Sequence, residues 1–224
     1  VVSTLGDDTL DQQLMNYIGD PHSERPFFKR GLIIGDVQSG KTSTYIGFLC
    51  KAADAGYKVF ILLTGTIEAL RRQTQERVEE GFIGIDMSAE STSGRRVGIG
   101  NPINAISLTS RVKDFTGDTD KTVISLASSN DAVVFVIKKN TKTLQNLTKW
   151  LVTLNADPVT KKIDMPMLMI DDEADNASIN TSKDKEDPTK INRLIRELAS
   201  VFTKANYVGF TATPFANVFI DPET

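Results

Sequence analysis

The 224-residue sequence predicts an α/β domain in which helices flank both faces of an open, mainly parallel β-sheet. Short apolar runs, which are typical of buried strands, alternate along the chain with longer segments whose apolar residues recur at helical spacing. One strand-to-helix junction, at residues 35–42, fits the pattern G-x-x-x-x-G-K-[ST], the phosphate loop of nucleotide-binding proteins. These observations together predict a P-loop NTPase domain.

Composition narrows the class of protein. The chain has 26 Lys and Arg against 29 Asp and Glu, and the net charge of −3 excludes a globally basic nucleic-acid binder but not local basic patches. A single cysteine, Cys50, excludes a disulfide framework, and with only one histidine, His22, it also excludes a zinc site. Because there is no membrane-length apolar run and no signal peptide, we expect a cytoplasmic protein with no membrane partner.

Apolar runs and turn residues place the expected elements in order. Strands are expected at residues 31–34, 58–63, 132–137, 167–170 and 207–210. Helices are expected at residues 9–18, 42–55 and 66–80, after 138–140, and from Pro188 onward. Gly56 and Gly81 are the expected ends of the second and third helices, and Asp187 is the expected N-cap of the last. We expect residues 1–224 to form a single domain.

Residues 82–130 interrupt this alternation. Gly, Ser, Thr and Asn dominate there, and apolar islets such as 106–108 are short, so we expect an irregular insertion. Elsewhere, apolar stripes mark the buried faces of three helices: Tyr45, Ile46, Leu49, Cys50 and Ala53; Leu144, Leu147, Leu151 and Leu154; and Ile191, Leu194, Ile195, Leu198 and Phe202.

The phosphate loop has the flanks that its chemistry needs. A strand, a glycine-rich turn and a helix N-terminus point several backbone N–H groups at one spot, where the helix dipole adds positive potential for a polyphosphate. The expected nucleotide-binding residues are Gly35, Gln38, Ser39, Gly40, Lys41 and Thr42. In this pattern Lys41 reaches the β- and γ-phosphates and the Thr42 hydroxyl ligates Mg²⁺.

A second motif, Asp171-Asp172-Glu173-Ala174-Asp175, follows the apolar strand at 167–170. The carboxyl end of such a strand is the ligand-binding edge of an open α/β sheet. We assign Asp172 to the metal and Glu173 to the attacking water, and Asp171 competes for the metal role. The alternative is an acidic turn that caps the next helix, which Asp175 would suit.

The segment Thr211-Ala212-Thr213-Pro214 follows the last expected strand. In a parallel sheet it would reach the same edge as the acids, where the hydroxyls of Thr211 and Thr213 could sense the γ-phosphate. Taken alone, the segment is equally a strand end followed by a proline turn.

The order of these motifs resembles the first RecA-like lobe of a superfamily-two helicase or translocase. Between the phosphate loop and the acids lie Thr64-Gly65-Thr66 and Leu70-Arg71-Arg72-Gln73, as in such lobes. The sequences of these motifs are more similar still to those of the bacterial Z-one domain family, putative endonucleases associated with these helicases. This similarity lies in residues 35–42, 51–57, 73–75 and 138–140, and the resemblance as a whole leaves the insertion out.

The resemblance implies an ATP hydrolase with ATP and Mg²⁺ as cofactors. It implies that Gly40, Lys41 and Thr42 bind phosphate and metal, that Asp172 and Glu173 are catalytic, and that Thr211 and Thr213 couple ATP to nucleic acid. These site residues are the ones already singled out by their motifs.

The resemblance also implies a nucleic-acid partner, DNA first and RNA as the alternative. The implied contacts are Thr64, Gly65 and Thr66 with Arg71, although Arg71 and Arg72 also suit a solvated helix face. Lys138 and Lys139 likewise suit a simple strand end.

Further partners follow from what the sequence lacks. The second RecA-like lobe and its arginine finger do not follow Thr213, so we expect a fragment that hydrolyses ATP weakly alone. The expected setting is a bacterial restriction or defence system with a nuclease or another subunit. No nuclease site is visible, because neither Glu-x-Lys nor Asp-x-Lys occurs in the chain. Two other functions stay open: an ATP-dependent regulatory switch, and a kinase, although no arginine-rich lid is visible.

Overall fold

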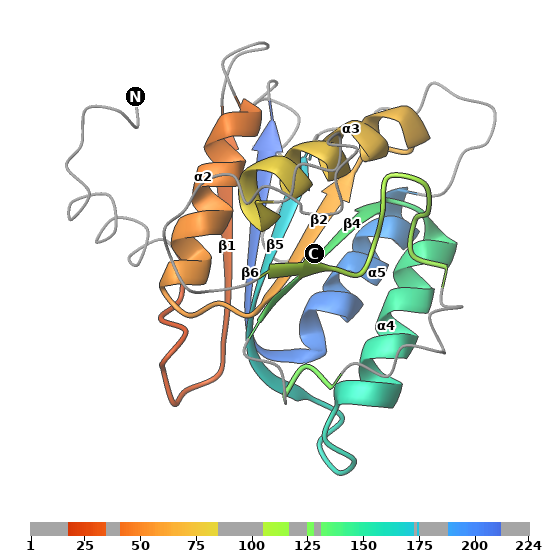
Figure 1. The fold of residues 1–224 in the computed structure, drawn as a ribbon. Helices are drawn as coiled ribbons and strands as arrows, with labels where there is room; N and C mark the ends of the chain where they lie inside the picture. Colours follow the sequence, from red (N-terminus) through yellow and green to blue (C-terminus); the bar gives the residue numbers. More distant parts are fainter. Residues whose placement is uncertain are drawn as a thin grey trace.

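A computed structural model describes residues 18–34, 41–84, 105–116, 125–127, 131–172, 174 and 188–211, with the backbone alone at 34, 41–43, 188 and 189. Within this part of the chain, six strands form one parallel sheet in the order β1-β6-β5-β2-β4-β3 (Figure 1). They are β1 (Phe27–Ile34), β2 (Val59–Thr64), β3 (Ala105–Ser107), β4 (Ala132–Lys138), β5 (Ile163–Asp172) and β6 (Phe202–Thr211). The predicted parallel sheet is confirmed, and all five predicted strands are present.

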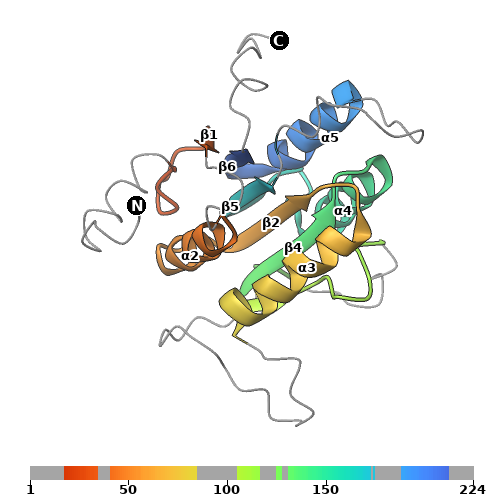
Figure 2. The same cartoon turned by 90° about the horizontal axis from the view of Figure 1, so that it is seen from above.

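Helices cover both faces of this sheet (Figure 2). On one side, called the α2 face below, lie α2 (Lys41–Asp54), α3 (Glu68–Val78) and the π-helical turn η2 (Glu79–Ile83). On the other, called the α5 face, lie α4 (Thr141–Asn155) and α5 (Pro188–Ser200). Because successive strand residues point to opposite sides, the central strands contribute to two separate apolar cores, one under each layer of helices. No helix in the described part of the chain has both the length and the apolar character to cross a bilayer.

The connections that leave β1 and β5 run to opposite faces of the sheet. β1 is followed by α2, whereas β5 is followed by α5, and only β6 lies between the two strands. In open parallel sheets, ligands bind outside the carboxyl ends of strands where successive connections diverge in this way. The topology therefore marks the ends of β1, β6 and β5 as the place for a site.

Helix α2 ends as the sequence predicts, at Gly56. The Tyr57 N–H donates to the Ala52 carbonyl at 3.0 Å and the Gly56 N–H to the Ala53 carbonyl at 3.0 Å, which is a Schellman cap. Gly56 has a φ of 110°, a left-handed backbone that other residues rarely adopt. The end of α2 is thus encoded locally.

Helices α4 and α5 pack their predicted apolar stripes on the α5 face. The Asn140 side chain caps α4 by accepting the Thr143 N–H at 2.8 Å. Leu144, Leu147 and Leu151 are completely buried. Phe202 is buried as predicted but belongs to β6 rather than to the preceding helix, because the chain turns at Val201.

The end of the α3 segment differs from the prediction. Gly81 does not end the helix: the chain continues as η2 and stops at Gly84, which has a φ of 76°. Gly81 instead permits close packing, since a Cβ there would lie 2.7 Å from Ile46 Cγ2 on α2. The glycine that the sequence suggested as a terminator is therefore a contact point between two helices.

Part of the segment expected to be irregular belongs to the sheet. Residues 105–107 form β3, which pairs in parallel with β4 at the edge. Beyond β3, side chains continue the pairing: Thr109 Oγ1 accepts the Val136 N–H at 2.9 Å, and Asp114 Oδ2 accepts the Lys138 N–H at 3.4 Å. A hydroxyl and a carboxylate thus accept hydrogen bonds from the N–H groups at the edge of β4. A pattern of apolar residues does not predict such contacts. The helix predicted at 9–18 lies outside the described residues, apart from Ile18.

Candidate functional site

The carboxyl ends of β1, β6 and β5 lie side by side. Ile33, Phe210 and Asp172 are aligned across the three strands, and Ile34 is paired with Thr211 one position further on. Because neighbouring strands are about 4.8 Å apart, the backbone leaves β1 within roughly 10 Å of the Asp172 backbone. The chain therefore leaves β1 close to the end of β5, where the acidic segment 171–175 begins; this segment is called the acidic turn below.

The phosphate-loop residues are described only at their helical end. Gly35, Gln38, Ser39 and Gly40 lie outside the described residues. Lys41 and Thr42 are the first residues of α2, and only their backbone is described. The structure thus has the strand before the motif and the helix after it, as the motif requires.

Asp172 lies on the same face of the sheet as α2. Its strand neighbours Leu168 and Ile170 pack into the core beneath α2, so the alternation of side chains directs Asp172 to that side. Asp172 is half-buried, at the end of β5. This places the predicted metal ligand toward the helix that begins with Lys41. Its predicted partner Glu173 lies outside the described residues.

Asp171 points the other way, toward the α5 face, where Met167 and Met169 are buried. Its Oδ1 accepts the Lys139 ammonium at 2.7 Å, and its Oδ2 accepts the Tyr207 hydroxyl at 2.7 Å. The Asp171 and Lys139 side chains are only 3% and 4% exposed. Both oxygens of Asp171 are therefore engaged on the side of the sheet away from α2, which argues against its competing assignment to the metal.

Two physical effects keep the Tyr207 hydroxyl a donor. Burial, and next the negative charge of Asp171, raise the pKa of Tyr207 far above its ordinary value. The Arg30 guanidinium, 5.6 Å from the centre of the Tyr207 ring, lowers the pKa of Tyr207 but does not reverse this rise. The phenol thus stays protonated and hydrogen-bonded to the Asp171 carboxylate.

Lys139 does more than end a strand. Besides its ion pair, the ammonium donates to the Asp172 backbone carbonyl at 3.2 Å, and the Lys139 N–H donates to the Thr64 carbonyl at 3.1 Å. Sequence reasoning missed Asp171, Lys139 and Tyr207 as a group. The available signal was a charged residue directly after an uninterrupted apolar strand, which occurs at Asp171 and needs a buried partner.

The turn after β5 lies close against β6 and β1. The Ala174 N–H donates to the Phe210 carbonyl at 3.0 Å. A Cβ at Gly209 would lie 3.0 Å from Ala174 Cβ and 3.2 Å from Leu32 Cδ1, so only a glycine fits there comfortably. Thr211, the last residue of β6, is buried beside the end of β1, whereas Thr213 lies outside the described residues.

The predicted nucleic-acid residues after β2 differ in exposure. Thr64 is buried, and its Oγ1 donates to the Ile137 carbonyl at 3.2 Å. Gly65 is also buried, whereas Thr66 is exposed in front of α3. Of the three, Thr66 alone presents its side chain at the surface in this structure.

Arg71 is in the interior, contrary to both sequence interpretations. Its side chain is 0% exposed. The guanidinium donates to Glu68 Oε1 at 2.7 Å, to the Ser110 carbonyl at 2.9 Å and to the Arg111 carbonyl at 3.3 Å. Arg71 therefore joins α3 to the segment after β3, and in this conformation it is neither a solvated surface residue nor accessible to a nucleic acid.

A polar network continues from Arg71 along the buried side of α3. Gln75 donates to Glu79 Oε1 at 2.9 Å and accepts the Thr109 hydroxyl at 2.8 Å. Arg111 donates to Glu79 Oε2 at 2.6 Å. Sequence reasoning missed this network, because α3 buries polar side chains where the other helices bury apolar ones.

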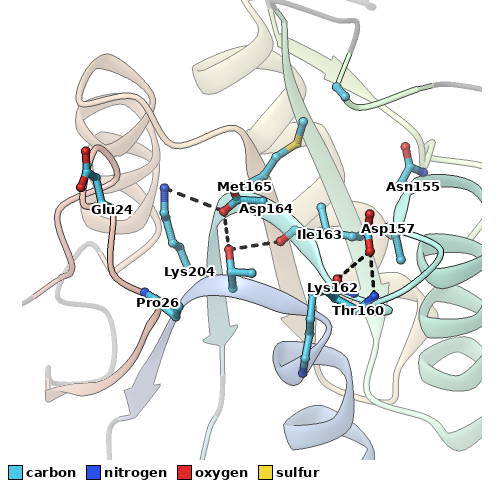
Figure 3. A pocket seen from close by; sticks show the side chains of 13 residues that line it. Glu24, Pro26, Asn155, Asp157, Thr160, Lys162, Ile163, Asp164, Met165 and Lys204 are labelled. Carbon is cyan, nitrogen blue, oxygen red and sulfur yellow. Dashed lines mark hydrogen bonds and ion pairs between the residues drawn. The ribbon is translucent and has the colours of Figure 1, made fainter.

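A hollow of about 600 Å³ lies at the opposite end of the sheet (Figure 3). The first residues of β5 and β6 line it, together with the chain after α4. Several of its polar groups are bonded to one another: Asp164 accepts the Thr203 hydroxyl at 2.7 Å, and Asp157 accepts the Thr160 N–H at 2.7 Å. We place the candidate site at the carboxyl edge, where the strand ends and the sequence motifs meet.

The described residues at the carboxyl edge do not form a metal site made of protein ligands alone. Among the described residues, no three His, Cys, Asp or Glu side chains gather where they could hold a metal ion. Asp172 brings one carboxylate to the α2 face, while Asp171 is turned away. Mg²⁺ commonly takes one or two carboxylates and completes its shell with water and substrate phosphates. A single acid on the α2 face, two strands from the end of β1, is compatible with that pattern.

The described residues define an α/β protein whose parallel sheet is compatible with a Rossmann-like or RecA-like arrangement. A scan against models of known protein families matches none of them, and a search of characterised proteins finds no relative. The family resemblance inferred from the motifs therefore stays a prediction, as does the identity of the phosphate loop.

Proposed function

We propose that this chain is the ATP-binding lobe of a nucleic-acid-dependent ATPase of the helicase or translocase type. The observation that supports it most is the alignment of Ile33, Phe210 and Asp172 across neighbouring strands, with Asp172 on the α2 face. It brings the entry to the G-x-x-x-x-G-K-[ST] motif close to an acid suited to hold Mg²⁺.

Each motif has a proposed part in ATP hydrolysis. Backbone N–H groups of the loop and the Lys41 ammonium would hold the phosphates, and Thr42 with Asp172 would hold Mg²⁺. Glu173 would orient the attacking water and accept its proton. Bound Mg²⁺·ATP supplies the terminal phosphoryl group that is transferred to water. The last residue of β6, Thr211, lies between the two motifs and would report the state of the site to a partner lobe.

The nucleic-acid partner and the wider setting rest on the resemblance of the motif order to superfamily-two lobes. We propose DNA as the partner, in a bacterial restriction or defence system of the cytoplasm, with a second RecA-like lobe supplying an arginine finger. The exposed Thr66, at the end of β2, is the described residue that best suits a phosphate contact. Any nuclease activity would belong to another part of the system.

Nucleotide binding is the first test of this proposal. Lys41→Ala should abolish binding of a fluorescent ATP analogue, because the motif loses its phosphate-binding ammonium. Lys149→Ala, which removes an exposed lysine from the middle of α4, is the matched control and should bind as the wild type does. Equal binding by both variants would remove the phosphate loop from the proposal.

Turnover in the full-length protein separates a motor from a switch. Glu173→Gln should keep nucleotide binding while lowering hydrolysis by about 10²- to 10⁴-fold, the usual contribution of a general base. DNA should stimulate the wild-type rate. Hydrolysis that is indifferent to DNA would favour the regulatory switch, and hydrolysis that survives Glu173→Gln would remove Glu173 from its role.

A further inference from the structure

The ion pair between Lys139 and Asp171 joins strands that are not neighbours. Lys139 directly follows β4, and Asp171 is near the end of β5, while β2 lies between the two strands in the sheet. The Lys139 backbone N–H is bonded to the end of β2 through the Thr64 carbonyl. One residue therefore ties together the carboxyl ends of three strands.

The same residue holds the backbone of the acidic turn. Its ammonium bonds both the Asp171 carboxylate, at 2.7 Å, and the Asp172 carbonyl, at 3.2 Å. On the β6 side, the Tyr207 hydroxyl holds the other Asp171 oxygen at 2.7 Å. The peptide that leads from Asp172 to Glu173 is thus anchored by a charged, directional contact rather than by apolar packing alone.

The need for a stable core does not account for this pair. Asp171 follows four consecutive buried apolar residues on β5, so an apolar side chain would suit its place in the strand equally well. Buried ion pairs often contribute little net stability, because their attraction only offsets the loss of hydration. The hydrogen bonds of such a pair are directional, however, so they hold the backbone in one conformation. A proposed catalytic acid needs a neighbouring backbone that is fixed in this way.

We propose that Lys139 is a positioning residue, which sets the placement of Asp172 and of the peptide bond that leads to Glu173, and links it to the loop that begins at Thr64. This inference rests on the proposed function, since it assigns the acids to Mg²⁺ and water. The expected consequence is an effect of Lys139 on Mg²⁺-dependent nucleotide binding and on turnover.

The test compares wild type with a variant that removes the pair without leaving a buried charge. Lys139→Met combined with Asp171→Leu removes both charges and, apart from the Tyr207 hydroxyl that loses its acceptor, leaves an apolar interior, so it should fold. Three quantities are measured in the full-length protein: the gain in nucleotide affinity on adding Mg²⁺, kcat against KM for ATP, and hydrogen exchange of the amides at 168–174. Lys139→Arg, which keeps a donor for Asp171, is the conservative control.

In the double variant we expect the Mg²⁺ gain and kcat each to fall by roughly 10- to 100-fold, as is usual when a contact behind a metal ligand is lost. KM should change little, and the amides at 168–174 should exchange faster. The control Lys139→Arg should lose less of the Mg²⁺ gain and of kcat than the double variant does. A folded double variant with wild-type kcat, Mg²⁺ gain and exchange would overturn the proposal. So would failure of the double variant to fold, because the pair would then be a requirement of the structure.

Failure of the proposed ATPase function and failure of the proposed role of Lys139 give different results. If Lys41→Ala leaves nucleotide binding unchanged, the proposed ATPase fails, whatever the double variant does. Hydrogen exchange at 168–174 needs no nucleotide, so it still shows whether Lys139 holds the acidic turn. If exchange there is unaffected, Lys139 has no positioning effect even in a working ATPase.

Discussion

The two faces of the sheet treat adjacent acids in opposite ways. On the α5 face, Asp171 is enclosed by Lys139 and Tyr207 and almost without exposure. On the α2 face, Asp172 is half-buried at the strand end, toward the helix that starts with Lys41. A shift of one residue along β5 thus separates an acid whose two oxygens are bonded to Lys139 and Tyr207 from an acid at the strand end on the α2 face. Consecutive acids at a strand end can therefore lie in different environments, because successive side chains point to opposite faces of the sheet.

The sharpest way to test this contrast is to neutralise each acid separately, and the largest effect should come from Asp172→Asn. Loss of a Mg²⁺ ligand removes several kcal/mol of transition-state stabilisation, so ATP hydrolysis should fall about a hundredfold or more. The melting temperature should barely change. A large loss of stability with unchanged turnover would reverse the roles of the two acids.

Asp171→Ala should lower stability as well as turnover: the unfolding free energy should fall, and kcat should fall roughly 10- to 100-fold because the Lys139 contact to this carboxylate is lost. It leaves the Lys139 ammonium buried without its partner, which costs about 3–5 kcal/mol. Denaturant unfolding followed by circular dichroism measures this cost. Asp164→Ala, which removes an exposed acid on the same strand, is the control and should change the unfolding free energy far less. An equal effect of the two substitutions would contradict the buried role of Asp171.

A third substitution, Arg71→Ala, examines the polar network on the α2 face. Its guanidinium satisfies two backbone carbonyls and Glu68, so its loss should destabilise the fold by about 2–3 kcal/mol. Arg72→Ala, an exposed neighbour, should be nearly neutral. DNA affinity, measured in parallel, distinguishes a structural role of Arg71 from a nucleic-acid contact. A variant of normal stability that binds DNA weakly would return Arg71 to the nucleic-acid surface.

The smallest effect is expected for Thr109→Val. This change removes the hydroxyl that accepts the Val136 N–H and donates to Gln75, leaving two buried polar groups unsatisfied. The cost should be about 1–2 kcal/mol in thermal or chemical unfolding. Thr148→Val, on α4, is a suitable comparison because its hydroxyl bonds only within its own helix. No difference between the two would mean that the edge of β4 is closed by other contacts.

Features encoded by local pattern were predictable. The strands at 132–137 and 167–170, the leucine stripe of α4 and the stop of α2 at Gly56 all depend on residues close together in the chain. Asp172 could also be predicted as the strand-end acid from its position after an apolar run. These predictions succeed because burial of apolar side chains and glycine backbone geometry need no distant partner.

Features that depend on polar partners far along the chain were not predictable. Arg71 donates to carbonyls at residues 110 and 111. Asp171 bonds to Lys139, which lies 32 residues earlier in the sequence, and to Tyr207, which lies 36 residues later. Charged residues are ordinarily assigned to the surface, since burial without a partner is costly. The same limitation hid β3, a three-residue edge strand whose pairing is completed by side chains.

The sequence by itself determined the α/β class, the order of the central strands along the chain and the presence of the three motifs. Hydrophobic periodicity and turn residues act over short distances, so these properties can be read from neighbouring residues. Only the tertiary structure decided which acid faces α2, which lysine holds the acidic turn and where Arg71 resides. Strand order and the facing of side chains set those answers, and both come into being only when distant segments pair.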